Sequence, residues 1–156
     1  MRNPFSCSPL SKAAAIIAGC VLALSAVGVE PAHAERLSVN ADIANIRSGP
    51  DTSDAVIWQV EKYHPLEVIQ KQGSWYLFED FEGDRGWIHS SLLADTRTVI
   101  VTNDQCNVRS GPGTENDIRF TVDKGVPFKV LEEKGKWVHV IHADGDKGWI
   151  HRSLIW

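Results

Sequence analysis

The chain contains the same module twice, and this internal repeat limits the possible folds more than any other feature of the sequence. A shift of 62 positions aligns residues 37–94 with residues 99–156, giving 22 identities in 58 pairs without a gap. The shared segments include Gly-Trp-Ile-His at 86–89 and 148–151, Arg-Ser-Gly-Pro at 47–50 and 109–112, and the tryptophans Trp75 and Trp137. Self-similarity of this kind indicates one supersecondary unit used twice.

The segment before the first module predicts an export signal rather than part of the fold. Arg2 and Lys12 precede an apolar run from Ala13 to Val29. Ala32-His33-Ala34 then supplies the small-x-small pattern that precedes a cleavage site. We therefore expect residues 1–34 to be a signal peptide, and the mature chain to be exported to the periplasm or cell envelope.

Two other fates of this segment stay open. The apolar run is at the short limit for a membrane-spanning helix, so the segment could remain as an uncleaved anchor. Ile17-Ala18-Gly19-Cys20 is similar to a lipobox, so the alternative is lipidation at Cys20. In all three cases we expect the two modules to cross the inner membrane.

The rest of the chain has room for two small domains. We assign residues 35–94 to the first domain, 95–98 to a linker and 99–156 to the second domain. Each module is near the lower size limit at which a single core is stable, so we expect the two copies to support one another.

The charge of the chain excludes polyanionic partners. The sequence has 16 Lys and Arg against 20 Asp and Glu, a formal net charge of −4. Such a protein repels nucleic acid and anionic lipid at long range. We expect no nucleic-acid partner, and membrane contact only through the signal segment if that segment stays uncleaved or is lipidated.

Within each module the residue pattern is that of short strands and turns. The expected strands are 37–40, 55–60, 65–70, 75–79 and 86–89, and 99–102, 118–122, 127–132, 137–141 and 148–151. Tyr76 and Phe78 alternate with Trp75, and we assign them to the core face. The stretches 42–54 and 104–117 are expected as long polar loops, because Ser-Gly-Pro at their centre cannot continue a strand.

No window of the two modules has a helical period. Five short strands with regular glycine turns in fewer than about 60 residues predict an all-β fold, in which each module is a small and strongly bent barrel.

The ordered motifs resemble the bacterial SH3-like (SH3b) domain family. They are Asn-Ile/Val-Arg-Ser-Gly-Pro, then Gly-x-Trp, then Gly-Trp-Ile-His-x-Ser-Leu, and the resemblance covers both modules in full. It implies two tandem SH3-type β-barrels in the cell envelope, used for targeting or binding and often found beside a cell-wall hydrolase. Asp51 stands where the second copy has Gly113, which leaves open a different path for the first loop.

Three pairs of equivalent residues are candidates for binding a ligand. They are Trp75 and Trp137, Arg47 and Arg109, and His89 and His151. The indoles point away from the expected core, and an exposed indole needs cover from a ligand, from the other barrel or from the long loop. The arginines could clamp a carboxylate, hold loop carbonyls, or pair with Asp42 and Asp104.

The resemblance adds two expectations about these surfaces. His89 and His151 stand where eukaryotic relatives of the fold keep a groove proline, which makes them binding candidates; donation to a turn carbonyl is the equal alternative. Leu92 and Leu154 replace a groove tyrosine, which argues against recognition of proline-rich helices. Trp87 and Trp149 are expected to be structural, because they fill the space beside a glycine.

Neither a metal site nor a catalytic centre is expected. His139 and His142 are three residues apart on a predicted strand, which places them on opposite faces. Cys106 is equivalent to Ala44, which indicates a small buried slot, and a buried thiol without a cationic neighbour is unreactive. We therefore expect no metal, no cofactor and no enzymatic activity.

The sequence favours a non-catalytic binding module of the cell envelope that recognises peptidoglycan or a short peptide through Trp, Arg and His side chains. The first alternative is a periplasmic adaptor that binds another envelope protein. The second is a thiol hydrolase that uses Cys106 as its nucleophile. The oligomeric state stays open.

Overall fold

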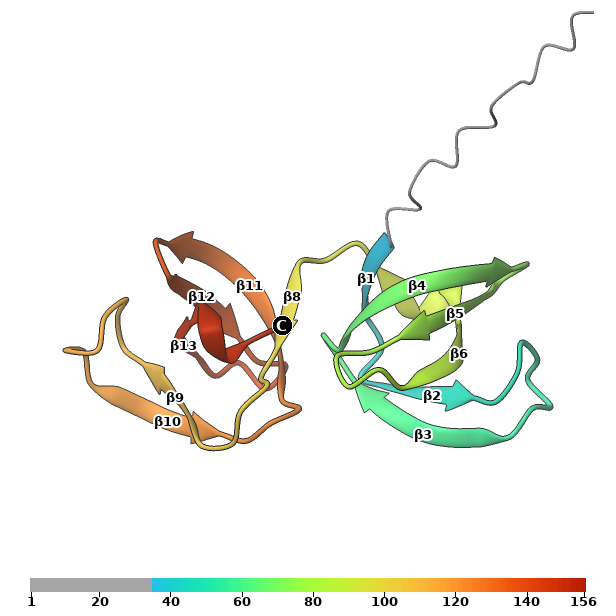
Figure 1. Cartoon of the computed structure of the whole chain (residues 1–156), viewed down its shortest axis with the longest axis horizontal. Helices are drawn as coiled ribbons and strands as arrows, with labels where there is room; N and C mark the ends of the chain where they lie inside the picture. The colour runs from blue at the N-terminus through green and yellow to red at the C-terminus, as the bar shows by residue number, and fades with distance from the viewer. Residues whose placement is uncertain (1–34) are drawn as a thin grey trace, which may run out of the picture. The chain divides into compact units, whose positions relative to one another are not determined.

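A computed structural model describes residues 35–156, so the predicted signal peptide and its possible lipidation at Cys20 lie outside the described residues. Residues 35–156 form thirteen strands and two short 3-10 helices, and no α-helix occurs among them. Accordingly, none of the described residues belongs to a helix that is long and apolar enough to span a membrane. Figure 1 shows the strands in two groups, one from each module.

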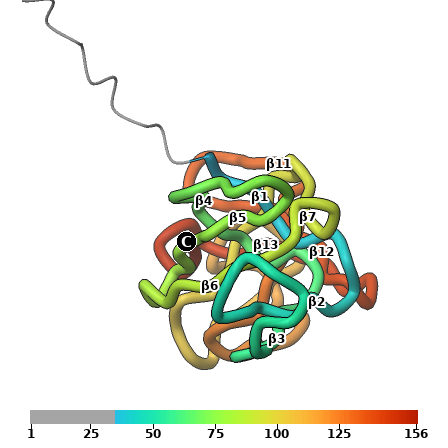
Figure 2. The backbone as a smooth tube through the Cα atoms, turned by 90° about the vertical axis from the view of Figure 1, so that its right-hand side faces the viewer, coloured from blue at the N-terminus to red at the C-terminus, as the bar shows by residue number. Residues whose placement is uncertain are grey.

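The first module forms one antiparallel sheet with the strand order β3-β2-β6-β5-β4-β1-β7. Its strands are β1 (Glu35–Val39), β2 (Ile43–Arg47), β3 (Val56–Glu61), β4 (Pro65–Gln72), β5 (Trp75–Glu79), β6 (Arg85–His89) and β7 (Leu93–Ala94). The 3-10 helix η1 (Ser90–Leu92) connects the last two strands. Figure 2, turned by 90°, shows the chain of this module curling back on itself instead of lying flat.

The second module repeats this order as β10-β9-β13-β12-β11-β8. Its strands are β8 (Thr98–Ile100), β9 (Cys106–Arg109), β10 (Ile118–Val122), β11 (Pro127–Lys134), β12 (Trp137–Ile141) and β13 (Lys147–His151), followed by the 3-10 helix η2 (Arg152–Leu154). The predicted all-β fold with two repeated modules is therefore confirmed. The strands at 75–79, 118–122 and 137–141 have the predicted bounds, and the others differ by at most two residues at either end.

Part of the predicted polar loop is in fact a strand in each module. Strand β2 occupies the first half of the stretch 42–54, and strand β9 lies within 104–117. Ala44 and Ile46 are fully buried, while Asn45 and Arg47 lie on the outward face. The strand was missed because only two inward side chains carry its alternation, and one of them is a small alanine. Each sheet consequently has more than the five strands expected.

Each module has its own hydrophobic core. The first core consists of Val39, Ala44, Ile46, Val60, Leu66, Val68, Phe78 and Ile88. The second consists of Val101, Cys106, Val108, Phe128, Val138, Val140 and Ile150. Phe78 is buried and Tyr76 packs against the first core, as predicted from the alternation along β5. The cores therefore hold the outward faces of β2, β5 and β6, and of their counterparts, in a fixed register.

A glycine allows two neighbouring strands to approach closely in each barrel. A Cβ atom at Gly148 would lie 2.6 Å from Cγ1 of Val108 and 2.7 Å from the backbone oxygen of Arg109. A Cβ atom at Gly86 would meet Ile46 in the same way. Strands β9 and β13 pair at Arg109 and Trp149, beside this contact. Glycine is required here because no side chain fits between the strands.

Candidate functional site

Each module has an open cavity lined by the same positions, which we call the first and second Trp–His cavities. The first has a volume of about 320 Å³ and is lined by Ile43, Asn45, Arg47, Thr52, Trp75, His89, Ser91 and Leu92. The second has a volume of about 250 Å³ and includes the equivalents Gln105, Asn107, Arg109, Thr114, Trp137, His151, Ser153 and Leu154. All six predicted site residues thus line these two cavities, three in each.

The tryptophan and the histidine of each cavity are cross-strand neighbours. Trp75 on β5 pairs with His89 on β6, and their ring centroids are 5.2 Å apart at an interplanar angle of 85°. Trp137 and His151 repeat this edge-to-face contact at 5.3 Å and 82°. Both indoles are half-buried and lie outside the two cores, as their outward orientation on the strand predicts. Each cavity therefore exposes part of an indole face beside an imidazole.

The histidine also caps a 3-10 helix, which fixes its ring. The backbone N–H of Ser91 donates to Nδ1 of His89 over 3.3 Å, and Oγ of Ser91 lies 2.7 Å from the same nitrogen. His151 and Ser153 repeat these contacts at 3.3 and 2.8 Å. Because a backbone N–H can only donate, the neutral ring carries its proton on Nε2. Within residues 35–156 the hydrogen bonds of these rings do not include donation to a turn carbonyl, which was the alternative to a binding role, and Nδ1 accepts from the backbone instead.

The arginines hold the loop that follows the second strand of each sheet. Nη1 of Arg47 donates to the carbonyl oxygen of Asp54 over 2.7 Å. Nη1 of Arg109 donates to the carbonyls of Thr114 and Asn116 over 2.9 and 2.8 Å. Of the three predicted roles, anchoring of loop carbonyls is the one observed.

The pairing of these arginines with Asp42 and Asp104 was wrong. Asp42 is paired with a lysine instead, because Nζ of Lys62 lies 3.4 Å from Oδ1 of Asp42. The backbone N–H of Lys124 donates to Asp104 over 3.3 Å. Because the anchored loops supply Thr52 and Thr114 to the cavities, the guanidinium groups also shape the cavity walls.

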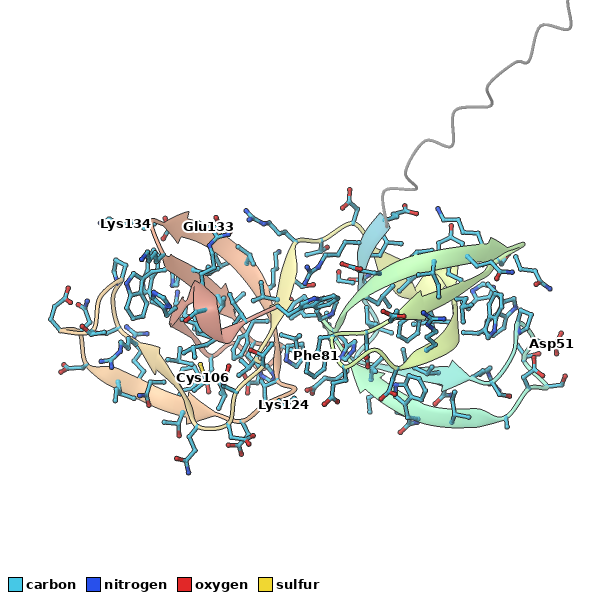
Figure 3. All side chains as sticks on the ribbon, in the orientation of Figure 1. Asp51, Phe81, Cys106, Lys124, Glu133 and Lys134 are labelled. Carbon is cyan, nitrogen blue, oxygen red and sulfur yellow. The ribbon has the colours of Figure 1, made fainter. Side chains whose placement is uncertain are left out.

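The two cavities differ in one wall and in their loops. Ile43, with 64% of its surface exposed, borders the first cavity, and Gln105 takes its place in the second. Asp51, at the outer loop between β2 and β3 (Figure 3), accepts hydrogen bonds from the backbone and side chain of Ser53. These bonds lower the pKa of Asp51. In the second loop Gly113 donates instead to the carbonyl of Gly111. The two cavities therefore differ in the residue at one rim position and in the hydrogen bonds of the adjacent loop.

The remaining chemically reactive side chains have structural surroundings. Cys106 is 2% exposed and its equivalent Ala44 is 1% exposed, so the predicted small slot is present in both cores. Burial raises the pKa of the Cys106 thiol (Figure 3), which disfavours the nucleophilic thiolate.

The two histidines considered as metal ligands have separate partners. The ring of His139 stacks on that of Trp149, with centroids 4.8 Å apart and an interplanar angle of 8°. Nδ1 of His142 lies 2.9 Å from Oδ1 of Asp144. Among residues 35–156, no group of three or more potential ligands could hold a metal ion. Trp149 is 9% exposed, in keeping with the structural role expected for it.

Several residues that line both cavities were not predicted as site residues: Asn45 and Asn107, Thr52 and Thr114, and Ser91 and Ser153. All six are identical between the copies. Identity at polar, outward-facing positions of the repeat was the signal that could have identified them, because core packing does not require it.

Comparison with protein families and with individual proteins yields a consistent result. The model of the family described as bacterial SH3 domain matches residues 40–95 and 102–156, which together make up more than half of the chain. The two matches correspond to the two sheets.

The similar proteins include enzymes of bacterial cell-wall metabolism by name. The chain is 24% identical over 128 residues to "Putative N-acetylmuramoyl-L-alanine amidase YrvJ" of Bacillus subtilis strain 168, a match that covers 75% of this chain and 24% of that protein. It is 35% identical over 57 residues to "Probable cell wall amidase LytH" of Staphylococcus epidermidis strain RP62A, covering 36% of this chain and 19% of that protein. The matched segments thus span about a quarter or less of these relatives.

Among solved structures, a crystal structure of an NlpC/P60 family protein from Bacillus cereus superposes with a TM-score of 0.38 and 14% identity. This match covers 78% of the present chain and 56% of the Bacillus cereus chain.

Proposed function

This chain belongs to the bacterial SH3 domain family, and from that premise we propose that it is a binding protein of the cell envelope that recognises peptidoglycan, or the short peptide within it, through its two Trp–His cavities. The observation that carries the proposal is the recurrence of one cavity in both copies. The same indole, imidazole, guanidinium, amide and hydroxyl groups line it twice, although fewer than half of all aligned positions are identical.

The chemistry of the cavities suits an uncharged polar ligand. A half-buried indole offers an apolar face, and the imidazole offers an N–H donor at Nε2. Asn45 and Asn107 can both donate and accept hydrogen bonds, as the amide groups of a peptide require. The guanidinium groups are engaged by loop carbonyls, so they contribute shape more than free charge. Open cavities of this size accommodate a few residues of a linear ligand rather than a folded domain.

The relatives support the setting of this function. Two of them carry cell-wall amidase names, and the export signal predicted in residues 1–34 would deliver the present chain to the same compartment. Amidase activity is not transferred to this chain, because the matches cover a small part of those proteins. We propose that the chain is not an enzyme and that the buried Cys106 has no catalytic role.

Retention on purified sacculi tests this function. We expect the protein to pellet with sacculi and the double variant Trp75→Ala, Trp137→Ala to lose about tenfold or more in retention, since aromatic anchors dominate such contacts. Ile69→Ala, an exposed residue outside both cavities, is the control and should pellet like the unaltered protein. A failure of the unaltered protein to pellet would exclude peptidoglycan as the ligand.

A specific observation favours one alternative, an adaptor that binds another envelope protein. Strands β3 and β10 are at the edges of their sheets and expose Val56, Ile57 and Ile118 by 46, 47 and 50%. Apolar edge strands are sites at which partner strands can add. Loss of an in-cell crosslink to a second protein in Ile57→Lys, with sacculus retention absent throughout, would favour the adaptor over the peptidoglycan binder.

A further inference from the structure

The first module has a second and larger cavity, which we call the His64 cavity. It has a volume of about 560 Å³, and its lining includes three aromatic residues, four acidic residues and one residue of the second module: Trp58, His64 and Phe81, then Glu61, Asp80, Glu82 and Asp84, and finally Gly125. It shares only Ile43 with the first Trp–His cavity. Four carboxylates beside three aromatic rings form an environment that is both anionic and apolar, and neither the core nor the proposed peptidoglycan site accounts for it.

His64 provides a buried polar atom without a partner in this cavity. Its side chain belongs to a residue that is only 7% exposed, and Nε2 has no hydrogen-bond partner within residues 35–156. The ring packs edge-on against Phe81, with centroids 6.3 Å apart. Burial lowers the pKa of His64, so the imidazole is neutral near pH 7 and one nitrogen can accept a hydrogen bond. Buried polar atoms are rarely left unpaired in native proteins, which points to a donor supplied from outside.

One of these carboxylates, that of Asp80, is held in place by the turn that carries it. Oδ1 of Asp80 accepts the backbone N–H groups of Glu82 and Asp84 over 2.9 and 3.0 Å, which fixes the turn between β5 and β6. Asp84 and Glu61 add further negative charge to the lining. A positively charged donor would therefore be attracted to the cavity and could bond to both carboxylate and imidazole.

One ammonium group of the chain, that of Lys124, already contacts the lining of the His64 cavity. Residues 35–156 belong to one compact unit, and within it Nζ of Lys124 lies 2.5 Å from Glu82 Oε1. The same nitrogen lies 5.7 Å from the ring centroid of Phe81 (Figure 3), a cation–π distance. Lys124 thus pairs with one carboxylate of the lining, that of Glu82.

We propose that the His64 cavity binds a primary ammonium group at the end of an aliphatic chain, as in the side chain of a lysine-type amino acid. The carboxylates of Asp84 and Glu61 balance the charge, Nε2 of His64 accepts one ammonium N–H, and Trp58 and Phe81 cover the methylene groups. The site is separate from the Trp–His cavities, so ammonium binding can be tested independently of peptidoglycan binding.

The second module provides a natural control for this site. Its equivalent cavity has a volume of about 250 Å³, and Val126 takes the place of His64. Ala143 replaces Phe81, and Asp144 is already paired with His142 at 2.9 Å. The second module therefore lacks both the buried acceptor and one aromatic wall, and we assign no ammonium site to it.

Titration of the full chain with Nα-acetyl-lysine amide, followed by NMR of the histidine rings, tests the proposal. We expect a saturable shift of the His64 ring nitrogens, and no binding of the uncharged analogue Nα-acetyl-norleucine amide. His64→Val, which copies the second module, and Asp84→Asn should each weaken binding by about tenfold, as loss of one charge-assisted hydrogen bond predicts. Lys124→Ala should strengthen binding, because it removes a competing ammonium.

Matched variants decide the outcome. Asp146→Asn, the equivalent of Asp84→Asn in the second module, and the double variant Trp75→Ala, Trp137→Ala should bind the probe like the unaltered protein. If His64→Val reduces the thermal stability of the first module, the result for Asp84→Asn decides, because Asp84 is exposed and its substitution should not disturb the core. Equal binding of the norleucine probe, or unchanged binding in Asp84→Asn, would overturn the proposal.

Discussion

His64 and Val126 occupy the same position of the repeat and show what one residue changes. A valine side chain has no polar atoms and needs no hydrogen-bond partner, whereas histidine has two ring nitrogens that need partners when buried. Near His64, the charged group that opposes the effect of burial on the ring is Asp80. The pKa of His64 is lowered because burial outweighs this carboxylate.

The lowered pKa predicts a pH dependence of stability. The unfolded chain takes up a proton at His64 near pH 6.5, the ordinary value for the group, while the folded protein resists it. The unfolded state therefore binds more protons below that pH, so the free energy of unfolding falls as pH decreases from about 6.5 towards the lower pKa of the folded state. Above this window the contribution is fully present.

Urea unfolding between pH 7.5 and 5 measures this effect. The unaltered protein should lose stability across the interval, and His64→Val should have a flatter profile. The carboxyls of Asp51 and Asp144, whose pKa values are lowered from 3.8, titrate below this range. Parallel profiles for the two proteins would rule out His64 as the group responsible.

At the scale of elements, each barrel depends on one glycine where two paired strands approach closely. Gly86 and Gly148 allow β6 and β13 to approach β2 and β9, and this places Arg47 and Arg109 beside Trp87 and Trp149 in the sheets. The same strands end at His89 and His151, so the close strand contact at the glycine also positions one wall of each Trp–His cavity. Packing of the core and placement of the site are coupled through this contact.

Substitution of Gly148 should reveal this coupling. In Gly148→Ala the new methyl group would meet Val108 and the backbone oxygen of Arg109, and the backbone cannot move without disturbing the sheet. We expect a loss of about 1–3 kcal/mol in the free energy of unfolding, the usual range for overpacking. Denaturant unfolding measures it, with the exposed Thr121→Ala as the control within the same barrel. Equal stability of the two variants would contradict the role of the glycine.

The cores of the two modules are different solutions to one packing problem. In the first core Leu66 and Phe78 are both fully buried, and in the second the equivalent positions hold Phe128 and Val140. The phenylalanine has moved to the neighbouring strand, which keeps the total side-chain volume nearly constant. The fold of the module therefore tolerates exchange within the core, while the shared lining positions of the Trp–His cavities are identical except for Ile43 and Gln105.

For the whole molecule, the arrangement of charge separates the two proposed sites. The chain has a net charge of −4, and the arginines of the Trp–His cavities are bound to loop carbonyls. Binding at those cavities should depend little on long-range charge. The His64 cavity, by contrast, relies on carboxylates that face solvent at the rim.

Salt should consequently act differently on the two sites. Retention on sacculi is expected to stay constant or to rise between about 50 and 500 mM salt, because salt screens only the repulsion between a negative protein and a negative wall. Binding of the lysine-type probe should fall about tenfold or more over the same range, as expected for attraction between exposed charges. A steep fall in sacculus retention would show that ionic contacts dominate there instead.

The fold was largely predictable from the sequence because its signals are local. Alternation along 75–79 and 137–141 and glycine at the turns depend on neighbouring residues only, and the repeat presents these local signals twice. Strands β2 and β9 escaped prediction because their outward faces carry the polar residues of the site and their inward faces carry few large side chains. The candidate site residues were found as a set, but their partners were not.

By itself, the sequence determined that this chain forms two copies of one all-β module, because strand periodicity and repetition are properties of the order of residues. Only the tertiary structure decided which residues meet. Arg47, Trp75 and His89 come from different strands, and His64 became a buried, unpartnered base because Phe81 and Asp80 fold against it from another turn. Burial and hydrogen-bond partners arise from contacts between distant segments, and local sequence pattern does not contain them.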